Sequence, residues 1–299
     1  MSEIKLFRYG TIVEELKSSN VLLEKEIQKV IEDNMFEFFG VHFLQSEWSV
    51  DNDKRRMDSI GIDENNCPVI FEYKRTVNEN VINQGLYYLN WIINHKKDFQ
   101  WLVLDKKDKK TAENIDWSSP RVICIAGDFN KYDEEAINFI DSNISLIRYT
   151  KFSNDLLMFE LINTKTVENI VGDTDKGKNS SKYNLVTFKE QYEKAPETLK
   201  NMFDDIKDYI MSLGDDVSMV VLKLYTAFKK IKNFATMEIY PTKILVNFKL
   251  NPDNYQLDNS LRDIREIGHW GCGDMQISLK IGDDLTKTKE LLKQSYELN

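Results

Sequence analysis

Apolar residues recur with two different periods along the first half of the chain. Residues 10–39 carry them at helical spacing, which predicts a helix or helix pair ended by Gly40. A strand is expected to follow at 41–50. Residues 57–63 and 69–74 then alternate with the period of a strand on either side of a turn-rich stretch at 64–68, which predicts a β-hairpin.

Beyond the hairpin, helical segments alternate with short apolar runs. Helices are expected at 78–97 and 133–141, and strands at 100–105, 121–127, 144–149 and 155–162. This order predicts the α/β class for residues 1–163.

The pattern changes after residue 163. Residues 164–184 are polar, rich in Gly, Ser, Asn and Lys, and without periodicity, so we expect a flexible linker there. Residues 185–299 should form a small α+β domain with an antiparallel sheet. Its expected helices cover 196–214 and 283–298, the second with an aspartate N-cap, and its expected strands cover 219–230, 233–242, 243–250 and 275–281.

Composition narrows the function classes. The chain has 299 residues, 41% of them hydrophobic, yet no apolar run approaches the roughly 18 residues that cross a bilayer. The N-terminal MSEIKLFRYG lacks the apolar core of a signal peptide. Cys67, Cys124 and Cys272 are scattered, and the three histidines lack metal-ligand spacing, so no disulfide framework or zinc site is expected. We therefore expect a cytoplasmic protein.

Charge argues against a general nucleic-acid binder, because the net charge is −9. The distribution is uneven, however. Residues 51–110 hold 11 Lys and Arg against 10 Asp and Glu, so the rest of the chain carries about −10. A locally basic rim therefore surrounds the hairpin, although ordinary solvated lysines explain residues 106–110 equally well.

The hairpin concentrates the candidate chemistry. Glu72 and Lys74 project from the same face of its second strand. A turn centred near Asn65 or Asn66 sets Asp58 opposite Glu72 or one residue away. Opposed carboxylates weaken a sheet and resist ionising together. A divalent cation would remove that conflict, since Mg²⁺ is typically held by one or two carboxylates plus waters and phosphate oxygens.

This arrangement resembles the PD-(D/E)xK nuclease superfamily, and most closely its RecB-like and NucS-type endonuclease domains. Asp58 matches the aspartate of the pattern, and Glu72-Tyr73-Lys74 matches E-x-K. Members usually carry a glutamate on the preceding helix, where Glu26 fits, with Glu24 and Glu32 as competitors. Many carry a glutamine on the following helix, where Gln84 fits. The literal Pro-Asp dipeptide of the family name is absent.

The resemblance implies a restriction-endonuclease-like mixed sheet flanked by helices and a metal-dependent endonuclease acting on nucleic acid, with DNA favoured. It assigns catalytic roles to Asp58, Glu72, Lys74, Gln84 and Glu26. Mg²⁺, or Mn²⁺ in its place, would be held by Asp58 and Glu72, with help from Glu26. Each residue also has an ordinary explanation: a surface charge, a cross-strand ion pair of Glu72 and Lys74, or a helix-surface amide. A catalytically silent adaptor for nucleic acid or protein is the alternative function.

Residues 185–299 resemble a small domain of unknown function often labelled "predicted transport protein". YTAFKKIKNFATMEI (225–239), GHWGCGDMQISL (268–279) and the final helix carry this resemblance. No membrane segment supports transport. His269 and Trp270 lie in a Gly-flanked turn that is explained by a ligand contact or, more simply, by a structural turn with a buried tryptophan. We expect a binding or dimerisation module, which would make the protein a homodimer in the second case.

Overall fold

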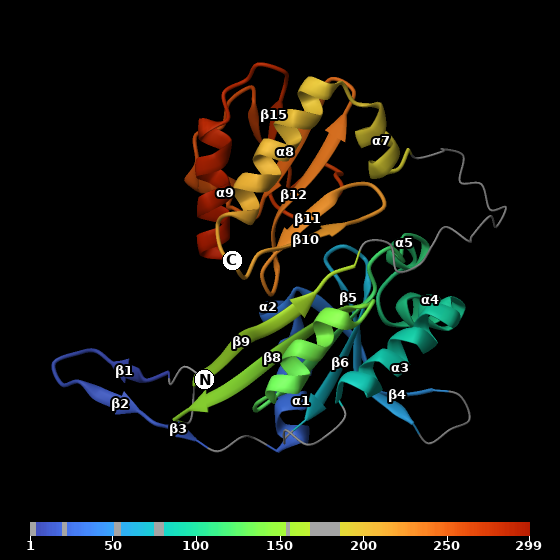
Figure 1. The fold of residues 1–299 in the computed structure, drawn as a ribbon, viewed down its shortest axis with the longest axis vertical. Helices are drawn as coiled ribbons and strands as arrows, with labels where there is room; N and C mark the ends of the chain where they lie inside the picture. Colours follow the sequence, from blue (N-terminus) through green and yellow to red (C-terminus); the bar gives the residue numbers. More distant parts are fainter. Residues whose placement is uncertain (1–3, 20–22, 51–54, 75–80, 154–155, 168–185) are drawn as a thin grey trace.

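A computed structural model describes residues 4–19, 23–50, 55–74, 81–153, 156–167 and 186–299. The protein has two halves (Figure 1). One is built on a seven-stranded sheet and the other on a six-stranded sheet, and each sheet has its own helices. The α/β class of the first half and the antiparallel sheet of the second are confirmed. Most of the expected linker lies outside the described residues. Thr164 and Lys165, which we assigned to it, instead end strand β9.

The first sheet has the order β3-β8-β7-β6-β5-β4, with β9 paired to the other side of β8. Strands β6, β7 and β8 run parallel, whereas β4–β5, β5–β6 and β8–β9 are antiparallel, so the sheet is mixed. The strands are β3 (Ser18–Ser19), β4 (Val41–Ser49), β5 (Arg56–Asp63), β6 (Pro68–Lys74), β7 (Arg121–Ala126), β8 (Asn143–Phe152) and β9 (Leu156–Lys165).

Helices cover both faces of this sheet because β6 is apolar on both sides. Val69, Phe71 and Tyr73 pack with Ile27 and other residues of α1 and α2. Ile70, from the opposite face, packs with α3 and α4. The helices are α1 (Glu24–Asp33), α2 (Met35–Phe39), α3 (Val81–Asn94), α4 (Lys96–Lys106), α5 (Lys109–Glu113), α6 (Lys131–Ala136) and the short 3₁₀ turn η1 (Ile137–Phe139).

Helix α4 replaces the strand expected at 100–105, so that prediction is wrong. Phe99, Leu102 and Val103 are buried, whereas Trp101 is 69% exposed. Spacings of three and four residues define the buried stripe of a helix, and the apolar run at 100–105 concealed this period. The helix stop at Gly40 is confirmed, because its φ of 64° is left-handed.

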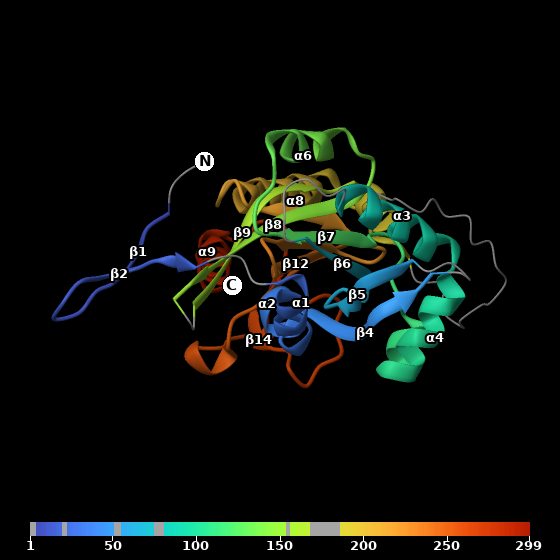
Figure 2. The same cartoon turned by 90° about the horizontal axis from the view of Figure 1, so that it is seen from below.

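A two-stranded hairpin, β1 (Leu6–Arg8) and β2 (Glu14–Leu16), projects away from the rest of the molecule in both views (Figures 1 and 2). The helix expected from residue 10 is therefore wrong at its start, because β2 and β3 occupy 14–16 and 18–19 and α1 begins at Glu24. The hairpin tip exposes Tyr9 and Ile12, which are 91% and 83% accessible. Such a small hairpin buries little apolar surface of its own.

The second half is an antiparallel sheet of order β10-β11-β12-β13-β15-β14, with apolar side chains of α7, α8 and α9 in its core. The strands are β10 (Ser218–Val221), β11 (Thr226–Lys229), β12 (Asn233–Tyr240), β13 (Lys243–Phe248), β14 (Leu261–Asp263) and β15 (Met275–Leu279). The helices are α7 (Phe188–Lys194), α8 (Glu197–Met211), the 3₁₀ turn η2 (Pro252–Asn254) and α9 (Thr286–Leu298).

Three details of this half differ from expectation. The run 219–230 is two strands, β10 and β11, rather than one. The N-cap of α9 is Leu285, although Asp284 accepts a hydrogen bond from the Thr286 amide at 3.0 Å. Trp270 is 39% exposed rather than buried, and its carbonyl oxygen accepts a hydrogen bond from Asn247.

The two halves meet at the turn of the β5–β6 hairpin. Asn65 Oδ1 accepts hydrogen bonds from the Tyr225 hydroxyl at 3.1 Å and from Asn233 Nδ2 at 2.8 Å. Glu64 forms an ion pair with Lys249. Cys67 packs in an apolar cluster with Val220, Leu222, Tyr225 and Ala227 of the second half. One hairpin therefore carries the candidate carboxylates near its open end and the contact between the two halves at its turn.

Candidate functional site

Asp58 and Glu72 lie opposite each other on adjacent strands. The β5–β6 register pairs Ser59 with Phe71, and one further step sets Asp58 opposite Glu72, as the turn position predicts. Directly opposed residues share a face of the sheet. The Asp58 amide donates to Glu72 Oε1 at 3.4 Å, and the Tyr73 amide donates to Asp58 Oδ2 at 2.9 Å. The two acidic residues are therefore immediate neighbours.

Loss of solvent raises the pKa of both acids. Glu72 is only 2% exposed, and loss of solvent, followed by repulsion from Asp58, raises its pKa well above the usual range. Burial also raises the pKa of Asp58 to about 6, although the Tyr73 amide and Lys74 oppose this shift. A cation at this position would favour the ionised form of both groups.

Lys74 completes the group at the end of β6. Its side chain is 12% exposed, and its Nζ lies 3.7 Å from Glu24 Oε1. Lys74 also lowers the pKa of both Asp58 and Glu72 through its charge. The cross-strand ion pair considered from the sequence gives way to a pair between β6 and the first turn of α1.

Glu24, rather than Glu26, is the acidic residue of α1 that belongs to this group. Glu24 contacts Lys74, and its charge raises the pKa of Asp58 and Glu72. Glu26 is exposed, and its Oε2 accepts a hydrogen bond from the Leu23 amide at 2.9 Å, where it caps its own helix. The assignment of Glu26 to the site is therefore not supported by its position.

Gln84 is exposed on α3, and among the contacts of the described residues none joins it to Asp58, Glu72 or Lys74. One helical turn later, Tyr88 is 4% exposed. Burial, followed by the charges of Glu72 and Asp58, raises the pKa of Tyr88 to about 12. From the sequence we assigned Tyr88 to the core. Its burial agrees with that, but its hydroxyl also lies in the field of the two acids.

The donor set fits one hard divalent cation, although it is small. Within the part of the chain that the structure describes, no group of three or more His, Cys, Asp or Glu side chains could hold a metal. Asp58 and Glu72 form a pair rather than a triad. A pair of carboxylates is still the usual protein contribution to Mg²⁺ sites that are completed by waters and substrate phosphates.

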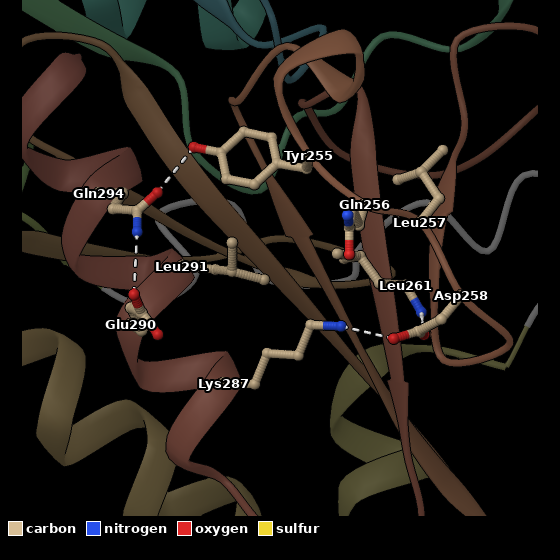
Figure 3. Close-up of a pocket in the computed structure, with 9 residues that line it drawn as sticks. All are labelled: Tyr255, Gln256, Leu257, Asp258, Leu261, Lys287, Glu290, Leu291 and Gln294. Carbon is tan, nitrogen blue, oxygen red and sulfur yellow. Dashed lines mark hydrogen bonds and ion pairs between the residues drawn. The ribbon is translucent and has the colours of Figure 1, made fainter.

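A hollow lies on the C-terminal half, between residues 255–258 and α9 (Figure 3). Its volume is about 590 Å³. Its polar groups already bind one another: Lys287 pairs with Asp258 at 2.6 Å, and the Tyr255 hydroxyl donates to Gln294 at 2.8 Å. The buried Leu261 and Leu291 also line it. Because these polar groups are already paired with one another, the groove is better explained as a structural feature than as a binding site for a polar ligand.

The fold and the site thus define a mixed-sheet α/β domain with a buried and a half-buried acid side by side, joined to an antiparallel α+β domain. Residues 188–299 match the family described as a domain of unknown function (DUF5655). The chain is 32% identical over 295 residues to an uncharacterized protein of Haemophilus influenzae, and the match covers 95% of this chain and 96% of that protein. The chain belongs to the same family as this protein. No solved structure matches it.

These comparisons confirm a C-terminal domain of unknown function, as expected. The nuclease resemblance of residues 1–163 continues to rest on Asp58, Glu72 and Lys74. In the described parts of the chain, every helix is too short or too polar to span a bilayer.

Proposed function

We propose that residues 1–163 form a Mg²⁺-dependent endonuclease that hydrolyses phosphodiester bonds in nucleic acid, with DNA as the favoured substrate and Mn²⁺ as an alternative metal. The observation that carries this proposal is that the buried Glu72 and the half-buried Asp58 lie side by side, with Lys74 next to them. Two acids that lose solvent and have raised pKa values cost stability unless a ligand uses them.

Asp58 and Glu72 would hold the metal, and Glu24 would add negative charge from α1. A bound Mg²⁺ supplies charge neutralisation at the scissile phosphate and a more acidic water. Lys74 would orient the attacking water or stabilise the negative charge that develops on the phosphate. Tyr88 would close the apolar side of the site, since it is buried and the charges of Glu72 and Asp58 reach its hydroxyl.

Residues 185–299 would then recognise the substrate or bring two copies together. The hairpin turn joins this domain to the nuclease domain through Asn65 and Cys67, so the recognition domain would be held at a fixed position relative to the site.

The net charge of −9 favours the second candidate, a catalytically silent adaptor that binds nucleic acid with the help of a partner or binds a protein. An adaptor does not explain why Lys74 stands beside the two acids. The two candidates differ in metal binding and in cleavage.

The test is cleavage of single-stranded, duplex and branched DNA and RNA by the purified protein with Mg²⁺ or Mn²⁺. We expect Lys74→Met and Asp58→Asn to lower the rate by about 10² or more, because each removes charge stabilisation in the transition state. Glu72→Gln should also weaken Mn²⁺ binding in calorimetry.

Glu26→Gln is the matched control, because Glu26 is an exposed acid of α1 that faces its own helix terminus. Asp63 would be a poor control, since it is buried in an ion pair with Arg121. Cleavage that is equal in the wild type and Lys74→Met would identify a contaminating nuclease. Absence of both metal binding and cleavage would favour the adaptor.

A further inference from the structure

Gln28 joins three elements directly behind the candidate site. Its Nε2 lies 2.9 Å from the Asp58 carbonyl oxygen, 2.9 Å from Glu32 Oε1 and 3.1 Å from Ser46 Oγ. The residue belongs to α1 and is 7% exposed. A carbonyl and a carboxylate only accept hydrogen bonds, so the amide must present its nitrogen to them. The orientation of this side chain is therefore fixed by its partners.

The carbonyl oxygen, the amide and the carboxylate of Asp58 each form a hydrogen bond near the site. Gln28 binds its carbonyl oxygen, Glu72 accepts from its amide, and the Tyr73 amide donates to its carboxylate. On the other side, β4 is distorted beside Asp58, because Glu47 has a left-handed φ of 50° between the pairs Ser46–Ser59 and Trp48–Met57. The regular strand ladder alone does not define the position of Asp58.

Ser59 is also hydrogen-bonded to α1. The Ser59 hydroxyl donates to Glu32 Oε1 at 2.6 Å, and Ser59 is fully buried. Glu32 therefore accepts from both Gln28 and Ser59, and two consecutive residues of β5 are anchored to one turn of α1. These connected hydrogen bonds restrict the movement of Ser59 and Asp58 relative to α1.

We propose that Gln28 is a positioning residue, which holds the main chain of Asp58 so that its carboxylate stays on the Tyr73 amide and opposite Glu72. Its effect on metal affinity and rate rests on the proposed function, whereas its effect on Asp58 does not. Without Gln28, the Asp58 carbonyl loses its side-chain donor in a part-buried setting, and the strand shifts to find another. Sub-ångström to one-ångström shifts of a reacting group lower rates strongly.

The variant Gln28→Met keeps the length of the side chain and removes its donors. Two amide signals report the result in NMR: the chemical shift of the Tyr73 amide and its hydrogen-exchange rate. We expect the shift to move and the exchange to accelerate by about 10-fold, the factor that corresponds to the loss of one hydrogen bond at this position. In Glu26→Gln, which changes an exposed acid of the same helix outside this network, both signals should stay close to those of the wild type.

Kinetic and binding measurements follow on the same proteins. We expect Gln28→Met to weaken Mn²⁺ binding or lower kcat by about 10–100-fold, with KM for the nucleic acid unchanged, and Glu26→Gln to retain the wild-type values. A merely structural role would lower the melting temperature and leave kcat and Mn²⁺ affinity of the folded fraction unaltered.

If Gln28→Met does not fold, Ser59→Ala carries the test, because it removes one hydrogen bond of the same network and little volume. Its Tyr73 amide should move in the direction expected for Gln28→Met. A wild-type Tyr73 amide in the folded variants overturns the inference. A wild-type protein that binds no Mn²⁺ and cleaves nothing overturns the proposed function instead, and the Tyr73 amide still decides the role of Gln28.

Discussion

Lys229 is the most unusual single residue outside the candidate site. It lies at the end of β11, is 6% exposed, and faces Arg121, Asp63 and Cys67 of the other domain. Burial, followed by repulsion from Arg121, lowers its pKa from 10.5 to about 7. Because Asp63 already pairs with Arg121, the charge of Lys229 is left without a carboxylate of its own in this group.

The sign of the pH dependence follows from this pKa. Between about pH 7 and 10.5 the unfolded chain keeps the lysine proton and the folded protein does not, so stability increases with pH across this window. Below pH 7 both states are protonated, and the full cost of the buried charge remains.

We therefore expect Lys229→Met to raise the free energy of unfolding at pH 7 by about 1–4 kcal/mol, as for other buried charges replaced by apolar residues. The variant should also lose the increase in stability between pH 7 and 10. Urea unfolding at several pH values measures both effects, with the exposed Lys223→Met as control. A Lys229→Met protein less stable than wild type at pH 7 would contradict the assigned cause.

The residues of the candidate site differ in how far the sequence could reveal them. Asp58, Glu72 and Lys74 were predicted because strand alternation and a short turn fix their relative positions. Gln28 was not, because it lies next to Ile27 at the edge of a helical stripe, and its partners Ser46 and Asp58 are distant in the chain. The choice between Glu24 and Glu26 also needed the packing of α1 against β6.

At the scale of elements, the β5–β6 hairpin was predicted correctly because its period and turn residues are local signals. Helix α4 was not, because a run of consecutive apolar residues fits a strand as well as a helix. The contact of the hairpin turn with the second sheet had no local signal either, since Asn65 and Tyr225 are separated by most of the chain.

We expect this turn to couple the two domains energetically. Asn65 is 5% exposed and accepts from both Tyr225 and Asn233. Asn65→Ala leaves these two donors buried without their acceptor, which costs about 1–3 kcal/mol.

A double-mutant cycle of Asn65→Ala and Tyr225→Phe, followed by urea unfolding, measures the part due to the Tyr225 hydroxyl. We expect a coupling free energy of about 0.5–3 kcal/mol. Additive effects of the two substitutions would show that the hydrogen bond contributes nothing to the joining of the domains.

At the scale of the whole molecule, the sequence indicated two domains, and the structure gives each half its own sheet and apolar core. It did not indicate that the domains would share buried contacts. The apolar cluster around Cys67, the ion pair of Glu64 with Lys249 and the hydrogen bonds of Asn65 all cross between them. We expect these contacts to keep the halves together without the chain connection.

The association of the two domains can be tested by inserting a specific protease site within residues 168–185. After cleavage we expect the two fragments to elute together in size-exclusion chromatography, because buried apolar and polar contacts persist without the connection. Leu222→Asp places a charge in the apolar cluster with Cys67 and should release the fragments, whereas Leu257→Asp, on the exposed groove of the C-terminal domain, should not.

Each released fragment should keep its circular dichroism spectrum and unfold cooperatively, since each has its own core. Fragments that separate in the wild-type background would show that the contacts at the hairpin turn are too weak to hold the domains, and released fragments without cooperative unfolding would show that neither half folds alone.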